Sequence, residues 1–308
     1  MINFNFPDFI EGYSIYQTYF HHRDKNRIMF YEDSCISSIY GTFPNCVWNG
    51  GSCYIGGPTY SYSYMKNKIE SFNEKGIAIR IIATNPLIEA HHLHDTYANL
   101  IMDAANNGFN EVVVCSSLLE DYLRDKYPNF KYVKSILASY EENKSITLDD
   151  KYYMSCMMRA ANNNWNYLDK IPPEKRHMVE FLCTDPCPDN CPRIKTHYHQ
   201  MAEIQLTLGK EGNMANYCSM SQLQRGELKN NYTHSLKSYI NREQIIKDYV
   251  PRGFTNFKIS GRFNVGTIAV SVAEYLVKPE YQSDWYESYI NELSRRGFSG
   301  WVKVLEDL

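Results

Sequence analysis

Three cysteines stand at equal intervals in the stretch FLCTDPCPDNCPRIKTHYH, at Cys183, Cys187 and Cys191. Three prolines of the same stretch stiffen the chain, because proline fixes φ and has no amide donor. Thiolates held in a stiff, irregular loop are ligands for iron–sulfur clusters and for structural zinc. The spacing C-x3-C-x3-C differs from the C-x2-C pairs of zinc knuckles and from the C-x3-C-x2-C run of radical-SAM enzymes. The stretch is therefore compatible with an iron–sulfur site, which tolerates several spacings, with structural zinc, and with a metal-free Cys-rich loop.

Only two or three such ligands are local, so at least one must come from another part of the chain. Cys218 in NYCSMS and Cys46 in FPNCVWNGG are the candidates, because both stand at expected loop or strand-end positions. In the zinc alternative the ligands would be Cys187 and Cys191 with some combination of His197, His199 and Cys218.

A disulfide framework is the least favoured interpretation of the cysteines. Their number is nine, which is odd, and the opening MINFNFPDFIEGY has no basic region followed by an apolar run. We therefore expect a cytoplasmic protein in which thiols stay reduced. Cys115 and Cys156 are expected to be small core residues, the first in a strand and the second on a helix face.

A cationic pair, Lys258 and Arg262, lies in FTNFKISGR. Residues four apart in a strand point to the same side, so both are expected to project together and to bind a carboxylate or phosphate of a substrate. The alternative for this pair is an internal salt bridge, for which Glu180 is a candidate partner.

The segment WNGG provides the other candidate substrate contacts, Trp48 and Asn49. Its glycines would allow the backbone to approach a ligand closely, and the indole could close over it. The alternative is a tight turn in which Trp48 is simply packed.

These residues must be positioned by alternating strands and helices. Short β-branched or aromatic runs alternate with segments of helical periodicity, which predicts a parallel sheet with helical crossovers. Strands are expected at 35–43, 77–84, 111–116, 131–139, 176–184 and 254–262, and helices at 62–76, 95–108, 117–128 and 238–253. No G-x-G-x-x-G follows the first expected strand, so dinucleotide binding has no support, and a TIM-like α/β barrel with a Cys-rich loop insertion is favoured over an open sheet. The candidate residues fall where strands end, which is where such barrels carry their active sites.

Length and composition fit one soluble barrel domain. The chain has 308 residues, 44% hydrophobic and 22% charged, and a net charge of −3, so no global basic field attracts nucleic acid or membrane. No apolar run approaches the ~20 residues that span a bilayer. We expect a single domain over 1–308, with an N-terminal segment at 1–34, the barrel core at 35–280 and a helical tail at 281–308.

Three segments of the chain resemble the collagenase-like peptidase family U32. FTNFKISGRFNVGTIAVSVAEYL is similar to a strand-then-helix signature of that family, with its motif residues at Lys258, Ile259, Gly261 and Arg262. CTDPCPDNCPRIKTHY resembles the Cys-Pro-Arg-x-x-x-His-Tyr pattern of short members, and IYGTFPNCVWNGG matches the end of the first strand. The three occur in the same order as in the family.

The resemblance implies a TIM-like barrel with a 4Fe–4S cluster, held best by Cys187 and Cys191, with Cys218 and Cys46 as further ligands and Cys183 in doubt. It also implies oxygen-independent hydroxylation, as in RNA modification, of a nucleobase or a small aromatic or acidic substrate. The alternatives are a non-catalytic metal-stabilised subunit of a homo- or heterodimer, and a peptidase. Peptidase activity lacks motif support, because the chain has neither H-E-x-x-H nor G-x-S-x-G.

Overall fold

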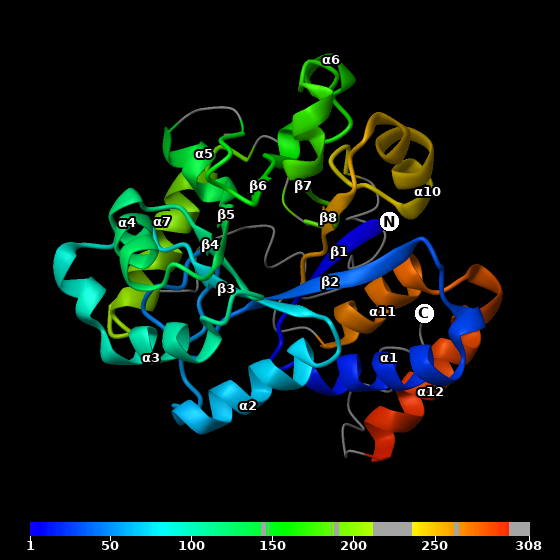
Figure 1. Cartoon of the computed structure of the whole chain (residues 1–308), viewed down its shortest axis with the longest axis horizontal. Helices are drawn as coiled ribbons and strands as arrows, with labels where there is room; N and C mark the ends of the chain where they lie inside the picture. Colours follow the sequence, from blue (N-terminus) through cyan, green and yellow to red (C-terminus); the bar gives the residue numbers. More distant parts are fainter. Residues whose placement is uncertain are drawn as a thin grey trace.

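Eight parallel strands follow one another around a closed barrel in the computed structural model of the chain (Figure 1). It describes residues 1–142, 146, 148–185, 187, 191–211, 236–261 and 265–295. The strands are β1 (Ile2–Pro7), β2 (Ser34–Gly41), β3 (Ala78–Ala83), β4 (Glu111–Val114), β5 (Lys131–Lys134), β6 (Met154–Cys156), β7 (Val179–Leu182) and β8 (Asn256–Lys258). The predicted fold class, a TIM-like α/β barrel, is confirmed.

Helices surround the ring of strands, as Figure 1 shows. They are α1 (Tyr13–Lys25), α2 (Tyr62–Asn73), α3 (Thr96–Ala105), α4 (Ser117–Lys126), α5 (Ile136–Glu142), α6 (Trp165–Leu168), α7 (Ile194–Leu206), α10 (Arg242–Gln244), α11 (Val265–Leu276) and α12 (Gln282–Arg295). Short 3-10 turns lie at η1 (Arg27–Met29), η2 (Ala90–His94), η3 (Arg159–Ala161), η4 (Pro173–Met178), η7 (Val250–Arg252) and η8 (Pro279–Tyr281), and η6 (Ile245–Tyr249) is a π-helical turn.

The barrel begins earlier than the core expected at 35–280. The segment 1–34 contains β1 and α1, and β1 closes the barrel by pairing with both β2 and β8. Its sequence INFNFP alternates asparagine with phenylalanine, which is the period of a strand with one polar and one apolar side. At the other end, α12 packs against α1 and α11, so the described part of the expected tail belongs to the outer helical layer.

Several of the expected elements differ from the structure. The strand expected at 176–184 begins only at β7, after η4, and the helix expected at 238–253 is divided into α10, η6 and η7. Cys156 lies in β6, a strand of three residues, and not on a helix face. The strand expected at 131–139 ends at Lys134, and α5 begins at Ile136. Strands this short carry too few residues for a period of two to be distinguished from a helical pattern.

The two sides of the barrel wall differ in chemistry. Phe4, Ile81 and Phe257 point outward into the large apolar layer between strands and helices. Inward-facing residues alternate with them and include a smaller apolar cluster that contains Tyr40 and Cys156. This alternation assigns the strand residues to the wall's outer or inner side, with one interruption at the register shift between Ile36 and Ser38 of β2.

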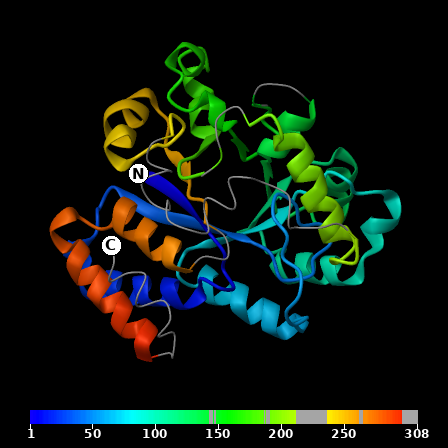
Figure 2. The same ribbon diagram turned by 180° about the vertical axis from the view of Figure 1, so that it is seen from behind.

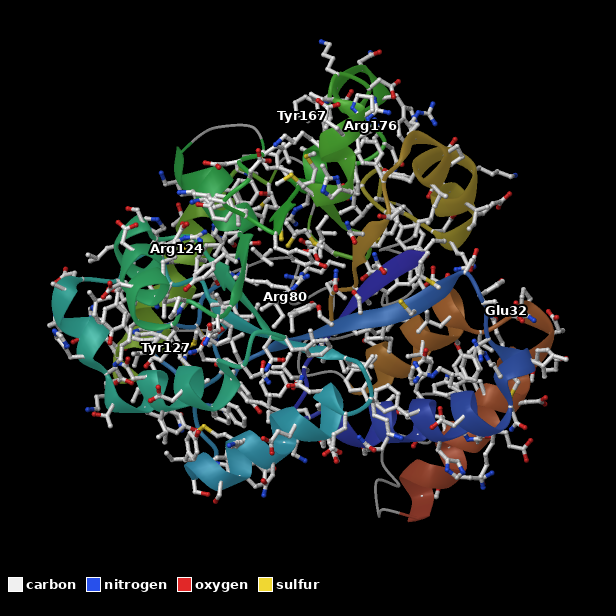
Figure 3. All side chains as sticks on the ribbon, in the orientation of Figure 1. Glu32, Arg80, Arg124, Tyr127, Tyr167 and Arg176 are labelled. Atoms are coloured by element: carbon white, nitrogen blue, oxygen red, sulfur yellow. The ribbon has the colours of Figure 1, made fainter. Side chains whose placement is uncertain are left out.

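Charged groups fill the middle of the barrel. Arg80 from β3 is fully buried and pairs with Glu111 of β4 at 2.5 Å and with Glu180 of β7. Asn5 of β1 donates to Glu180 at 2.6 Å, and the Cys156 thiol lies 2.8 Å from the same carboxylate. Figure 3 shows Arg80 inside the ring of strands. Residues from opposite walls meet here, so this polar layer closes the barrel below its carboxyl end.

Within the described ranges, no helix combines the length and the apolar character that crossing a membrane requires.

Candidate functional site

The loop that follows β7 carries the central cysteine of the candidate site. Asp185 organises this loop, because its Oδ1 accepts the backbone N–H of Cys187 at 3.2 Å. Its Oδ2 lies 2.8 Å from Nη1 of Arg159, which is in the turn that follows β6. The carboxyl ends of neighbouring parallel strands thus place a carboxylate, a guanidinium and a thiol together.

Aromatic side chains cover the Arg159 guanidinium. Its Nη2 donates to the Tyr198 hydroxyl of α7 at 3.4 Å, and the Tyr198 ring stacks on Tyr140 of α5 at 6.0 Å between centroids. Burial raises the pKa of both tyrosines, so their hydroxyls stay protonated at neutral pH. The guanidinium is itself fully buried.

Cys187 and Cys191 are partly buried free thiols on this loop. Burial, with Asp185 adding to it, raises the pKa of Cys187 to about 12, although Arg159 acts in the opposite direction. Soft sulfur donors of this kind suit zinc and iron–sulfur clusters. Among the described residues, however, no three His, Cys, Asp or Glu side chains come together as a metal site. The fit to a cluster therefore rests on Cys187 and Cys191, and a complete ligand set would need residues outside the described ranges.

The surroundings of Cys183 and Cys46 differ from those of Cys187 and Cys191. Cys183 follows β7 with its side chain 1% exposed in the outer apolar layer, and burial raises its pKa well above the usual value. Cys46 is 2% exposed in the same layer, and burial raises its pKa to about 11. Thiols in this apolar setting behave as small core residues, and a ligand role for Cys183 or Cys46 stays a prediction. Cys218, the remaining predicted ligand, lies outside the described residues.

Lys258 ends β8 and follows the inward alternation of the barrel wall. Its Nζ lies 4.0 Å from the centroid of the Tyr40 ring, and the Tyr40 hydroxyl donates to the carbonyl of Ile259 at 2.6 Å. Burial alone would raise the pKa of Glu180, but Arg80 and Lys258 outweigh it and lower that pKa. Lys258 therefore faces the barrel mouth, and its charge interacts with the buried carboxylate of Glu180.

The expected pairing of Lys258 with Arg262 has no strand to support it. β8 ends at Lys258, and Gly261 has a φ of +125°, so the period of two does not extend to residue 262. Arg262 itself lies outside the described residues.

The WNGG loop packs onto the barrel wall. Trp48 is fully buried, donates its indole N–H to the carbonyl of His92 at 2.8 Å and meets the Tyr122 ring edge-on. Asn49 is also fully buried and donates to the carbonyl of Ser52 at 2.8 Å. The indole therefore cannot close over a substrate from this position, and the packed turn is the interpretation that fits.

Gly50 explains why this loop needs glycine. A Cβ there would stand 2.0 Å from the carbonyl oxygen of Thr84 at the end of β3. The backbone of the loop does make a close approach, as expected, but it approaches the backbone of Thr84 and not a ligand.

Helix α7 runs from the residues around Arg159 toward the ends of β2 and β3. Sequence patterns did not reveal this relationship. Near its start, Tyr198 contacts Arg159 and packs beside Cys115, which follows β4. Near its end, Gln205 donates to the carbonyl of Cys46 at 2.9 Å and accepts from the amide of Tyr54 at 2.7 Å. Figure 2, the view from behind, shows α7 in front of the strands.

Asn85, which follows β3, fastens the same helix. Its Nδ2 donates to the carbonyls of Ala202 in α7, at 3.0 Å, and of Val47, at 3.2 Å. The only sequence signal for this contact was the position of Asn85 at a strand end. Together, Gln205 and Asn85 hold α7 over the β2 and β3 side of the mouth.

Comparison with known proteins gives one structural similarity. No protein-family model matches the chain, and no curated protein matches it. The solved structure of the U32 peptidase Mk0906 is similar to it, with a TM-score of 0.46 and 14% sequence identity, over 85% of this chain and 94% of that one.

Proposed function

We propose that the protein is an iron–sulfur enzyme with its site at the carboxyl end of the barrel. The cluster would be held by Cys187 and Cys191, with Cys218 as a further ligand. The reaction would be a redox conversion, such as oxygen-independent hydroxylation, of a nucleobase or a small aromatic or acidic substrate. The observation that carries this proposal is that the Cys187 loop leaves β7 at the same end of the barrel at which β8 presents Lys258.

The donor chemistry of the loop supports a cluster. Cys187 and Cys191 are free thiols, Asp185 shapes the turn at Cys187, and the Arg159 guanidinium adds a positive charge near that thiol. Positive charge and hydrogen-bond donors next to sulfur favour thiolate ligation and stabilise a negatively charged cluster. Such a cluster, when bound, supplies one-electron transfer or a Lewis-acid iron.

The residues around Lys258 indicate what would bind beside the loop. The ammonium group rests on the electron-rich face of Tyr40, and this contact holds it in place. Glu180 shares the polar layer below and balances part of its charge. Lys258 would attract a carboxylate or phosphate of the substrate, and the Tyr40 ring offers an aromatic surface next to it.

Anaerobic purification of the full chain tests the proposal. We expect brown protein with an absorption band near ~400 nm, and loss of this band in Cys187→Ser and Cys191→Ser. Cys35→Ser is the matched control, because Cys35 lies at the start of β2, the opposite end of that strand from the site. Colourless wild-type protein with one tightly bound zinc, or with no metal, would overturn the proposal.

A further inference from the structure

Arg159 is a buried cation to which the proposed function gives no role in substrate binding. Its side chain is 0% exposed, although arginine is rarely buried without good reason. Burying a guanidinium costs several kcal/mol unless its partners compensate. Its Nε finds no acceptor among the residues that the structure describes. The contacts of Arg159 should therefore explain why the guanidinium is buried despite this cost.

The partners of Arg159 come from the segments that surround the Cys187 loop. Asp185 lies on that loop, 2.8 Å from Nη1, and Tyr198 lies on α7, 3.4 Å from Nη2. The positive charge of the guanidinium also acts on the Cys187 thiol and on the Tyr140 hydroxyl of α5, since it lowers the pKa of both groups against the effect of burial. Arg159 thus links the end of β6 to the loop through Asp185 and to α7 through Tyr198.

Asp185 transmits this anchoring to the cysteine. One carboxylate oxygen faces Arg159, and the other accepts the backbone N–H of Cys187 at 3.2 Å. The second contact closes an Asx turn, which fixes the backbone two residues after the aspartate. Without the guanidinium, the carboxylate would lose its counter-ion, and the turn would lose its attachment to the barrel wall.

We propose that Arg159 is the positioning residue of the Cys187 loop: through Asp185 it fixes the turn that presents the thiol, and it places a positive charge near the sulfur. The part of this proposal that concerns a bound cluster rests on the proposed function. The part that concerns the loop does not, because its contacts exist without any metal.

Hydrogen exchange in the metal-free full chain tests the loop. We compare wild type, Arg159→Met and Arg159→Lys in a peptide spanning 183–193, with the β3 segment 78–83 as internal reference. We expect Arg159→Met to speed exchange in the first peptide at least ~10-fold while the β3 segment changes little, and Arg159→Lys to lie between. Arg252→Met is the control, because it removes a partly exposed arginine that pairs with Asp169 and leaves the contact of Arg159 with Asp185 intact.

Two other outcomes of this measurement would contradict the proposal. Unchanged exchange at 183–193 in Arg159→Met would show that the loop is held without Arg159. An equal rise in both peptides would assign Arg159 to overall stability alone. These results do not depend on iron, so wild-type protein without a cluster would sink the proposed function and leave the loop measurement valid.

If the cluster is present, its reduction potential gives a second readout. A positive charge near a ligating sulfur stabilises the reduced, more negative form of a cluster, so it raises the potential. We expect Arg159→Met to shift the midpoint potential to more negative values, and Arg159→Lys, which keeps the charge, to restore part of the shift. A potential identical in all three proteins would show that the charge does not act on the cluster and would overturn this part of the proposal.

Discussion

Arg80 and Glu180, 100 residues apart in the sequence, pair at the centre of the barrel with both side chains fully buried. Glu180 also lies in the field of Lys258, which lowers its pKa together with Arg80. One carboxylate thus connects the interior ion network with the cation at the mouth. Replacing Arg80 therefore tests whether this network holds the barrel together.

Arg80→Met would leave Glu111 and Glu180 buried with their main counter-ion removed. We expect it to lower the free energy of unfolding by about 3–5 kcal/mol, as measured by urea denaturation. Lys66→Met is the control, because Lys66 pairs with Glu70 on the outer helix α2 and both side chains are about half exposed, so its loss should cost about 1 kcal/mol or less. Equal midpoints for the two variants would contradict the importance given to the interior network.

Gly50→Ala tests the packing of the WNGG loop on β3. The new Cβ would stand 2.0 Å from the Thr84 carbonyl oxygen, so the backbone of one segment must move. We expect a loss of about 2–4 kcal/mol in the free energy of unfolding. Gly56→Ala is matched to it, because it has a φ of +76° but nothing within 4 Å, and should cost only about 1 kcal/mol. A milder effect at Gly50 than at Gly56 would refute the close approach.

Gln205→Ala tests the attachment of α7 over the mouth. The substitution removes the contacts to Cys46 and Tyr54 and leaves their buried backbone groups without this partner. We expect faster hydrogen exchange along 194–206 and a loss of about 1–3 kcal/mol in stability. Glu203→Ala, an exposed position on the same helix, should leave exchange unchanged. Similar exchange in both variants would mean that other contacts hold α7.

The sequence predicted those parts of the fold whose elements are long and strongly patterned. Helices α2 and α3 occur as expected, and Asp95 caps α3 by accepting the Ala98 amide at 2.7 Å. Strands β1 and β6 were not predicted. The three residues of β6 carry no period, and β1 lies in the segment 1–34, which we expected outside the barrel core at 35–280.

The candidate site was predictable only where chemistry is local in the sequence. The Cys187 loop stood out by its spacing, and Lys258 by its place at a strand end. Arg159 gave no such signal, because its role arises from a contact with Tyr198, 39 positions away in the sequence. Tyr198 stands in the quoted segment CPRIKTHY, but its place there did not indicate the contact with Arg159. The packing of Trp48 was not predictable for the same reason, because its partner His92 lies on a different segment.

Glu274 on α11 predicts how stability changes with pH. Burial raises its pKa to about 7, against a hydrogen bond with Tyr275, and it faces Cys183, Tyr275 and Tyr286. The folded state therefore holds this proton more tightly than the unfolded state, so stability should fall as the pH rises from about 4.5 to about 7. Glu274→Gln should match wild type near pH 4 and exceed its free energy of unfolding by on the order of 2–3 kcal/mol at pH 8. Parallel pH profiles for the two proteins would contradict the raised pKa.

Iron content across four cysteine variants tests the central claim, that a cluster is held by the loop after β7, most directly. The measurement is iron per chain in anaerobically purified, full-length protein. We predict about four irons in the wild type, in Cys46→Ser and in Cys183→Ser, whose thiols lie in the apolar layer, and loss of iron in Cys187→Ser and Cys191→Ser. Iron retained in Cys187→Ser and Cys191→Ser, or absent from the wild type, would contradict the account.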